Sequence, residues 1–229
     1  MKRHGVRVND LHALIKPDLA KYAVDPVVIS QVFNLDDADV LSDSRKAIHV
    51  LPPMDKQLAA WLEIDPNIRN VGAVLGPGHE ALLAETNEAA QALGIKFHYA
   101  IAESDRETLY LFDRLVRDID GYLLFPDNRI LSRSVLSDML GIAARQRVQV
   151  AVFNEPLLDL GATFSASATE VDIAETIIRA LNEIMDGNLD GVPSVTPLND
   201  VRITTNPAAL RRFGLLPDEA QQNTVADVP

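Results

Sequence analysis

Four short runs of β-type residues recur in the middle of the sequence at nearly constant intervals. They begin at Val71, Phe97, Gly121 and Val148, so consecutive starts are 26, 24 and 27 residues apart. The residues between them carry apolar side chains at intervals of three and four, the pattern of an amphipathic helix. Strands and helices that alternate at this spacing form a parallel sheet covered by helices on both faces. The sequence therefore predicts an α/β fold.

Three helices are expected between these four strands. The first covers 82–93 and is followed by Gly94, a residue type that commonly ends helices. The second opens with Ser104-Asp105-Arg106-Glu107, which has the spacing of a capping box. The third covers 131–143. The flanks are less regular, and we expect further strands at 27–33, 47–51, 163–165 and 201–204, further helices at 11–24, 56–64, 169–187 and 207–213, and a loose polar tail at 217–229.

Composition and charge exclude several classes of function. The chain has 21 Lys and Arg against 33 Asp and Glu, a net charge of −12 with no long basic run, which disfavours nucleic acid and anionic membranes as partners. There is no Cys, and the five His residues show no ligand spacing, so we expect no metal and no cofactor. No apolar stretch approaches the roughly 18 residues that a membrane span needs. No export signal is visible, so we expect a periplasmic protein if a signal was removed or omitted, and a cytoplasmic one if the chain is complete as given.

Polar residues follow each expected strand of the sheet. Ligands of open parallel sheets bind beyond the carboxyl ends of the strands, where helix N-termini and loop amides gather. Each polar residue by itself is a common turn former or helix cap, but together they form a plausible binding site. The loops in question are Gly76-Pro77-Gly78-His79, Ala102-Glu103-Ser104, Pro126-Asp127-Asn128, Phe153-Asn154-Glu155 and Ser165-Ala166-Ser167.

The first of these loops also allows a nucleotide-binding interpretation. Residues 76–81 fit the relaxed dinucleotide fingerprint G-x-G-x-x-A between a strand and a helix. Pro77, however, lacks the N–H that a pyrophosphate would use, so nucleotide binding is the less favoured reading. The sequence has no G-x-S-x-G elbow, no phosphate-binding P-loop and no paired histidines, and nothing in it indicates an enzyme.

Four stretches, in order, resemble the ABC-transporter substrate-binding family of the tryptophan/tyrosine-binding type, which has the type I periplasmic-binding-protein fold. They are KQLAAWLEIDPNIRNVGAVLGPG, DGYLLFPDNRILS, VQVAVFNEPLLDLGATFSASAT and VRITTNPAALRRFGL. The resemblance implies that Asp127 and Asn128 lie against a ligand, with Asp127 accepting hydrogen bonds from an ammonium group. It also implies cleft positions for Gly78, His79, Asn154, Glu155 and Ser165.

The resemblance further implies a two-lobed chain whose first lobe is short. Family members spend over a hundred residues on the first lobe, whereas only about fifty precede Pro52-Pro53 here. We therefore expect one complete Rossmann-like lobe and one reduced lobe. The expected boundaries are 1–53 with 166–192 for the reduced first lobe, 54–165 for the complete second lobe, and 193–216 for a hinge return and C-terminal segment.

The leading functional expectation is non-catalytic binding of a small, amino-acid-like polar molecule as the solute-binding component of an ABC importer. Its partners would be that ligand and an ABC permease. One alternative is a ligand-independent homodimeric interaction or sensory protein, because a reduced lobe leaves apolar surface and strand edges to cover. A nucleotide-binding α/β protein is the remaining alternative.

Overall fold

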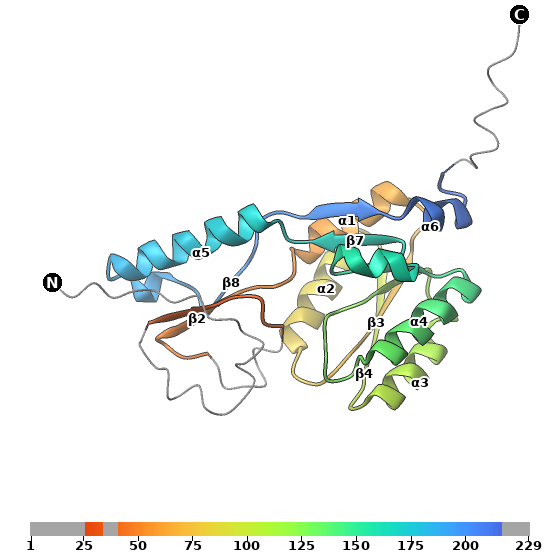
Figure 1. The fold of residues 1–229 in the computed structure, drawn as a ribbon, viewed down its shortest axis with the longest axis horizontal. Helices are drawn as coiled ribbons and strands as arrows, with labels where there is room; N and C mark the ends of the chain where they lie inside the picture. Colours follow the sequence, from red (N-terminus) through yellow and green to blue (C-terminus); the bar gives the residue numbers. More distant parts are fainter. Residues whose placement is uncertain (1–25, 34–40, 217–229) are drawn as a thin grey trace, which may run out of the picture. The chain divides into compact units, whose positions relative to one another are not determined.

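The computed structural model describes residues 26–33 and 41–216, so the expected helix at 11–24 and tail at 217–229 lie outside the described residues. The chain forms two compact units (Figure 1). Met1–Val50 with Glu170–Leu198 makes up one, here called the first lobe, and Leu51–Thr169 with Asn199–Pro229 makes up the second lobe. The chain therefore passes between the lobes three times.

The second lobe contains a six-stranded sheet with the order β4-β3-β5-β6-β7-β9. All neighbouring strands pair in parallel except β7 and β9, which are antiparallel. This arrangement confirms the expected α/β fold with a mainly parallel sheet. The strands are β3 (Asn70–Leu75), β4 (Lys96–Ile101), β5 (Gly121–Leu123), β6 (Gln149–Val152), β7 (Phe164–Ser167) and β9 (Arg202–Thr205).

Helices cover both faces of this sheet. Tyr122 in β5 packs edge-to-face on Phe112 of α3, with ring centroids 4.7 Å apart. The preceding residue, Gly121, lies under Trp61 of α1 so closely that a Cβ at this position would collide with the indole ring. Successive residues of a strand point to opposite faces, so α1 and α3 cover opposite faces. The helices are α1 (Met54–Ile64), α2 (Glu80–Ala92), α3 (Asp105–Leu115), α4 (Arg133–Gln146), the 3-10 helix η4 (Glu155–Leu160) and α6 (Pro207–Arg212).

Local signals in the sequence account for several helix ends. Ser104 caps α3 by accepting a hydrogen bond from the backbone N–H of Glu107, as the capping-box spacing predicted. Ser132 caps α4 in the same way through the N–H of Val135. Gly94 follows α2 with a φ of 71°, a left-handed conformation that glycine adopts without strain.

The last part of the chain belongs to the second lobe. Residues 193–216 were expected as a hinge return and C-terminal segment, and of these residues 199–216 group with the second lobe. β9 pairs along the whole of β7, from Phe164 opposite Thr205 to Ser167 opposite Arg202. This long-range pairing explains the difference, because no local sequence pattern specifies which strand a terminal segment will join.

The first lobe is small in the part of the chain that the structure describes. Its three strands, β1 (Val27–Ile29), β2 (Arg45–Ile48) and β8 (Val195–Thr196), pair in parallel in the order β1-β2-β8. β1 is shorter than the strand expected at 27–33, because Gln31 has a φ of 64°, which ends the extended conformation. The long helix α5 (Glu170–Met185) contacts β1 and β2, and the short 3-10 helix η5 (Leu189–Gly191) follows it.

Candidate functional site

The candidate site lies at the point where the second-lobe sheet changes its winding direction. From β3 the chain crosses through α2 to β4 on one side, and then returns through α3 to β5 on the other side of β3. The carboxyl ends of β3 and β5 are therefore adjacent, and their loops leave toward opposite faces. Open α/β sheets characteristically bind ligands in the crevice at such a point.

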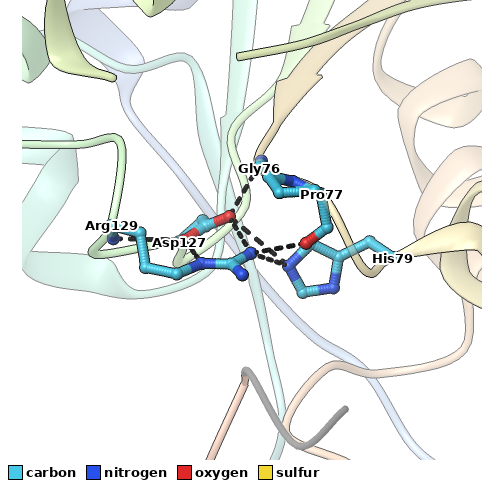
Figure 2. A network of polar contacts seen from close by, with 5 residues as sticks. All are labelled: Gly76, Pro77, His79, Asp127 and Arg129. Atoms are coloured by element: carbon cyan, nitrogen blue, oxygen red, sulfur yellow. Dashed lines mark hydrogen bonds and ion pairs between the residues drawn. The ribbon is translucent and has the colours of Figure 1, made fainter. Parts of the chain in front are cut away.

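A buried ion pair occupies this position (Figure 2). Two of the guanidinium nitrogens of Arg129 donate to the Asp127 carboxylate: Nε to Oδ1 at 2.9 Å and Nη2 to Oδ2 at 2.8 Å. The Asp127 side chain is 0% exposed and the Arg129 side chain 27% exposed. Two-point contact of this kind fixes the plane of the guanidinium as well as its distance from the carboxylate.

The same two side chains connect the loop after β5 to the loop after β3. The Gly76 N–H donates to Oδ2 of Asp127 at 2.9 Å, and Nη2 of Arg129 donates to the Pro77 carbonyl at 3.0 Å. A Cβ on Gly76 would lie 2.6 Å from that carboxylate oxygen, so only glycine allows this approach. Gly78 has a φ of 85°, which also favours glycine.

His79 completes the network at the start of α2. Its Nε2 lies 2.8 Å from Nη2 of Arg129 and 3.4 Å from Oδ2 of Asp127. Because a guanidinium only donates, Nε2 accepts from Arg129 when it carries no proton and donates to Asp127 when it carries one. The imidazole is 6% exposed, so it lies inside the network and not on the surface of the loop.

The surroundings of Asp127 keep its carboxylate charged. Burial alone would raise the pKa of Asp127, but the contacts with His79 and with the backbone N–H groups of Gly76 and Arg129 outweigh it and hold the pKa below its usual range. Burial also lowers the pKa of Arg129, although an arginine stays charged at any physiological pH. The site therefore contains an ionised pair.

The other expected site residues lie after β5 and β6 or within β7. Asn154 comes after β6, and its Oδ1 is buried with no hydrogen-bond partner among the described residues. Ser165 in β7 is 0% exposed, and its hydroxyl likewise has no partner in the described parts of the chain. Glu155 is exposed and accepts a hydrogen bond from Oγ1 of Thr204 at 2.8 Å. Asn128 is exposed beside the ion pair.

The network thus brings two expected site residues, His79 and Asp127, together, with Gly78 in the same loop as His79, and it adds a residue that the sequence analysis overlooked. Arg129 follows Asp127 by two positions, and an Asp–x–Arg triplet in a loop is a signal that could have been noticed. Both oxygens of Asp127 accept hydrogen bonds within the chain, from the N–H of Gly76 and from Arg129. Its expected contact with a ligand ammonium group stays a prediction.

The nucleotide interpretation of the loop at 76–81 finds no support in this geometry. The N–H of Gly76, which a pyrophosphate would need, donates to the Asp127 carboxylate instead. That carboxylate places a negative charge where the phosphates would lie, and like charges at such a distance repel. Within residues 26–33 and 41–216, no group of three His, Asp or Glu side chains is arranged to hold a metal ion.

A separate surface hollow lies at the opposite edge of the sheet. It is formed around the start of α6 and the end of η4, with Thr205, Asn206 and Gly161 among its lining residues. Thr205 pairs with Phe164 at the amino-terminal end of β7. The hollow is therefore away from the carboxyl ends of the strands, and we do not assign the site to it.

Comparison with solved structures identifies the fold as that of the type I periplasmic binding proteins. A conserved domain protein from Vibrio cholerae is 20% identical with a TM-score of 0.65, and the match covers 90% of this chain and 73% of that one. An ABC domain in complex with L-Trp from Streptococcus pneumonia is 14% identical with a TM-score of 0.64 over the same shares. A ligand-free, open substrate-binding protein with adhesive properties from Clostridium difficile is 18% identical with a TM-score of 0.58, covering 87% and 71%. The TM-scores, and not the low sequence identities, show that the fold is shared.

Searches by sequence find nothing comparable. No family model matches the chain, and no curated protein matches it. Among the described residues, no helix has both the length and the apolar character that crossing a bilayer requires.

Proposed function

We propose that this chain binds a small polar molecule, without changing it chemically, at the carboxyl ends of β3, β5 and β6 in the second lobe. The observation that carries the proposal is the buried Asp127–Arg129 pair at the switch point of the sheet. An ionised carboxylate is costly to bury, because it loses its hydration, and Asp127 is 0% exposed while Arg129 stays partly exposed. Its position at the edge where α/β sheets bind ligands favours a role in recognition over a purely structural one.

The wider role we propose is that of the solute-binding component of an ABC importer, with a permease as its partner and an amino-acid-like compound as its ligand. The support is the similarity of fold to a domain in complex with L-Trp and to a substrate-binding protein. In this role the chain acts as a carrier, so no catalytic group is required.

Thermal unfolding in the presence of candidate ligands tests the proposal. The single tryptophan of the sequence, Trp61, is fully buried in the second lobe, so its fluorescence reports the unfolding of that lobe. A ligand present at 100 times its Kd stabilises the native state by about 2.7 kcal/mol. For a chain of this size that raises the melting temperature by roughly 5–10 °C. A panel of amino acids, organic acids, sugars, nucleotides and amines that leaves the midpoint unchanged would reject ligand binding.

A homodimer without a ligand is the second candidate, and the edge strand β4 is the observation that favours it. In the described residues no strand pairs with the outer edge of β4. The N–H of Lys96 donates to the carbonyl of Arg69, just before β3, and the N–H of Ala102 donates to Leu75 in β3. Backbone groups alternate along a strand, so those of Phe97, Tyr99 and Ile101 face outward.

The side chains of Phe97, Tyr99 and Ile101 lie on one face of β4, and they would fit the same side chains of a second copy. Tyr99 is 55% exposed and Ile101 40% exposed, and the Phe97 ring stacks on Tyr99 at 5.9 Å. If a second copy paired antiparallel with Tyr99 opposite Tyr99, each Phe97 would lie opposite an Ile101 on the same face. Such apolar cross-strand pairs stabilise sheets, so the edge fits a second copy of this chain.

A further inference from the structure

The helix α5 of the first lobe carries a row of exposed apolar side chains at regular intervals. Val171 is 64% exposed, Ile178 56% and Met185 76%, and consecutive members of the row are seven residues apart. Ala174 and Leu181 lie between them, so the five residues occupy the a and d positions of a heptad repeat. This is the pattern by which one helix packs along another.

The row lies on the side of α5 that is opposite its buried face. Asp172, Thr176 and Ala180 are the buried residues of the helix and are spaced four apart, so they form one face. Ile178 follows Thr176 by two positions, which turns it by about 200° around the helix axis. A partner can therefore reach the apolar row without disturbing the packing of α5 on its own lobe.

We propose that this row binds the same row of a second copy of the chain, with the two α5 helices antiparallel. Proteins that self-associate most often do so about a two-fold axis, which brings the same surface of both copies together. An exposed row of large apolar side chains gains free energy when such a contact removes it from water. The inference concerns the first lobe alone, and it depends neither on ligand binding in the second lobe nor on the edge of β4.

The charged residues beside the row determine the direction of the pair. In a parallel pair, the g position of one helix faces the next e position of the other, so Glu170 would lie opposite Glu175 of the second copy, and two carboxylates there repel. In an antiparallel pair, each flank of the row meets the same flank in reverse order. Glu175 then lies opposite Asn182 and beside Arg179 of the second copy. All three side chains are exposed, so the antiparallel contact pairs opposite charges and fixes the register.

The contact is short, which limits the strength of the dimer. From Val171 to Met185 the helix rises by about 21 Å. A single pair of helices of this length belongs to the smaller class of interfaces, which form weak and reversible complexes. We therefore expect a monomer–dimer equilibrium in which the mean mass rises with concentration.

Analytical ultracentrifugation of the full chain tests the inference. Concentrations up to about 1 mM are used, so that even a millimolar dissociation constant is measured. Ile178→Lys is the deciding variant, because residue 178 lies at the centre of the antiparallel pair and the two new ammonium groups would face each other. We expect this change to raise the dissociation constant about tenfold or more. Leu160→Lys, at an apolar residue of similar exposure (49%) in η4, is the matched control and should leave the dissociation constant unchanged.

Reversing the charges at Glu175 and Arg179 tests the direction of the pair. Glu175→Arg or Arg179→Glu alone places like charges on the facing flanks and should weaken the dimer about two- to fivefold. Both changes together restore opposite charges and should return the dissociation constant to the wild-type value. In a parallel pair, Glu175→Arg would instead remove the repulsion from Glu170 and strengthen the dimer. Circular dichroism controls for helix content, because residues 175 and 179 are also neighbours within one helix.

The other outcomes reject the inference, and each has its own meaning. A chain that stays monomeric at every concentration has no such contact. If Ile178→Lys then lowers the stability toward urea, another part of the same chain covers the row; if the stability is unchanged, the row is left for a different protein. A dimer that Tyr99→Lys dissociates and Ile178→Lys does not would have its contact at β4. Ligand binding is measured separately by thermal unfolding, so failure of the α5 contact would leave the proposed function in place.

Discussion

Arg129 and Asp127, two positions apart in one loop, form a two-point ion pair in which the carboxylate is completely buried and the guanidinium partly exposed. The pair links the loops after β3 and β5 through Gly76 and Pro77. It therefore fixes the two loops relative to each other at the switch point of the sheet.

Replacing Arg129 alone should lower the free energy of unfolding more than replacing both Arg129 and Asp127. Arg129→Gln leaves the buried carboxylate of Asp127 without the guanidinium but with its contacts to Gly76 and His79, so we expect a loss of about 1–3 kcal/mol of unfolding free energy. Asp127→Asn with Arg129→Gln leaves no buried charge, so it should restore most of that loss. Urea unfolding followed by Trp61 fluorescence measures both. If the single variant were as stable as wild type, the pair would have no structural role.

The contribution of Asp127 to stability should depend on pH in one direction. Its native surroundings hold its pKa below the usual 3.8, so the unfolded chain binds this proton more readily than the native one. Asp127 therefore contributes its full stabilisation at any pH above its pKa in the unfolded chain. This stabilisation is lost as the pH falls toward and below its lower pKa in the native protein. The difference in unfolding free energy between wild type and Asp127→Asn should be present at pH 5 and shrink below about pH 4. A difference that grew on acidification would contradict the assigned direction.

Gly76→Ala should disrupt the network by steric conflict. Its Cβ would lie 2.6 Å from Oδ2 of Asp127 and 2.7 Å from Nη2 of Arg129, so the ion pair must shift. We expect a loss of about 1–3 kcal/mol in unfolding free energy. Gly141→Ala in α4 is the matched control, because its nearest neighbour would be Arg145 at 3.4 Å. In a helix interior this change should be neutral or stabilise by about 0.5–1 kcal/mol.

Tyr99→Lys should separate a dimer into monomers if β4 is the contact between two copies. The paired strands would place the two new ammonium groups opposite each other, where like charges destabilise a sheet. Tyr110→Lys is the matched control, since Tyr110 is similarly exposed, at 60%, but lies on α3. Light scattering after size-exclusion chromatography gives the masses. Wild-type protein that is monomeric at all concentrations would reject the dimer.

The sequence predicted the architecture of the second lobe because that architecture is encoded locally. Alternating β-type and amphipathic runs fix which segments become strands and which become helices, and the structure confirms the α/β fold that they indicated. The cap at Ser104 and the left-handed Gly94 are likewise properties of a few consecutive residues. Even the edge at which a ligand would bind follows from the parallel strand order.

The features that the sequence did not predict depend on contacts between segments that are far apart in the chain. The pairing of β9 with β7 joins residues about forty positions apart, and the close approach of Trp61 to Gly121 joins residues sixty apart in sequence. Asp127 was recognisable as a candidate from its loop, but its partners, Gly76 and His79, are some fifty residues away. A carboxylate in a sequence looks the same whether it faces a ligand or an arginine. Only the folded chain, which buries one side of the ion pair and leaves the other partly exposed, decides which charge the site presents.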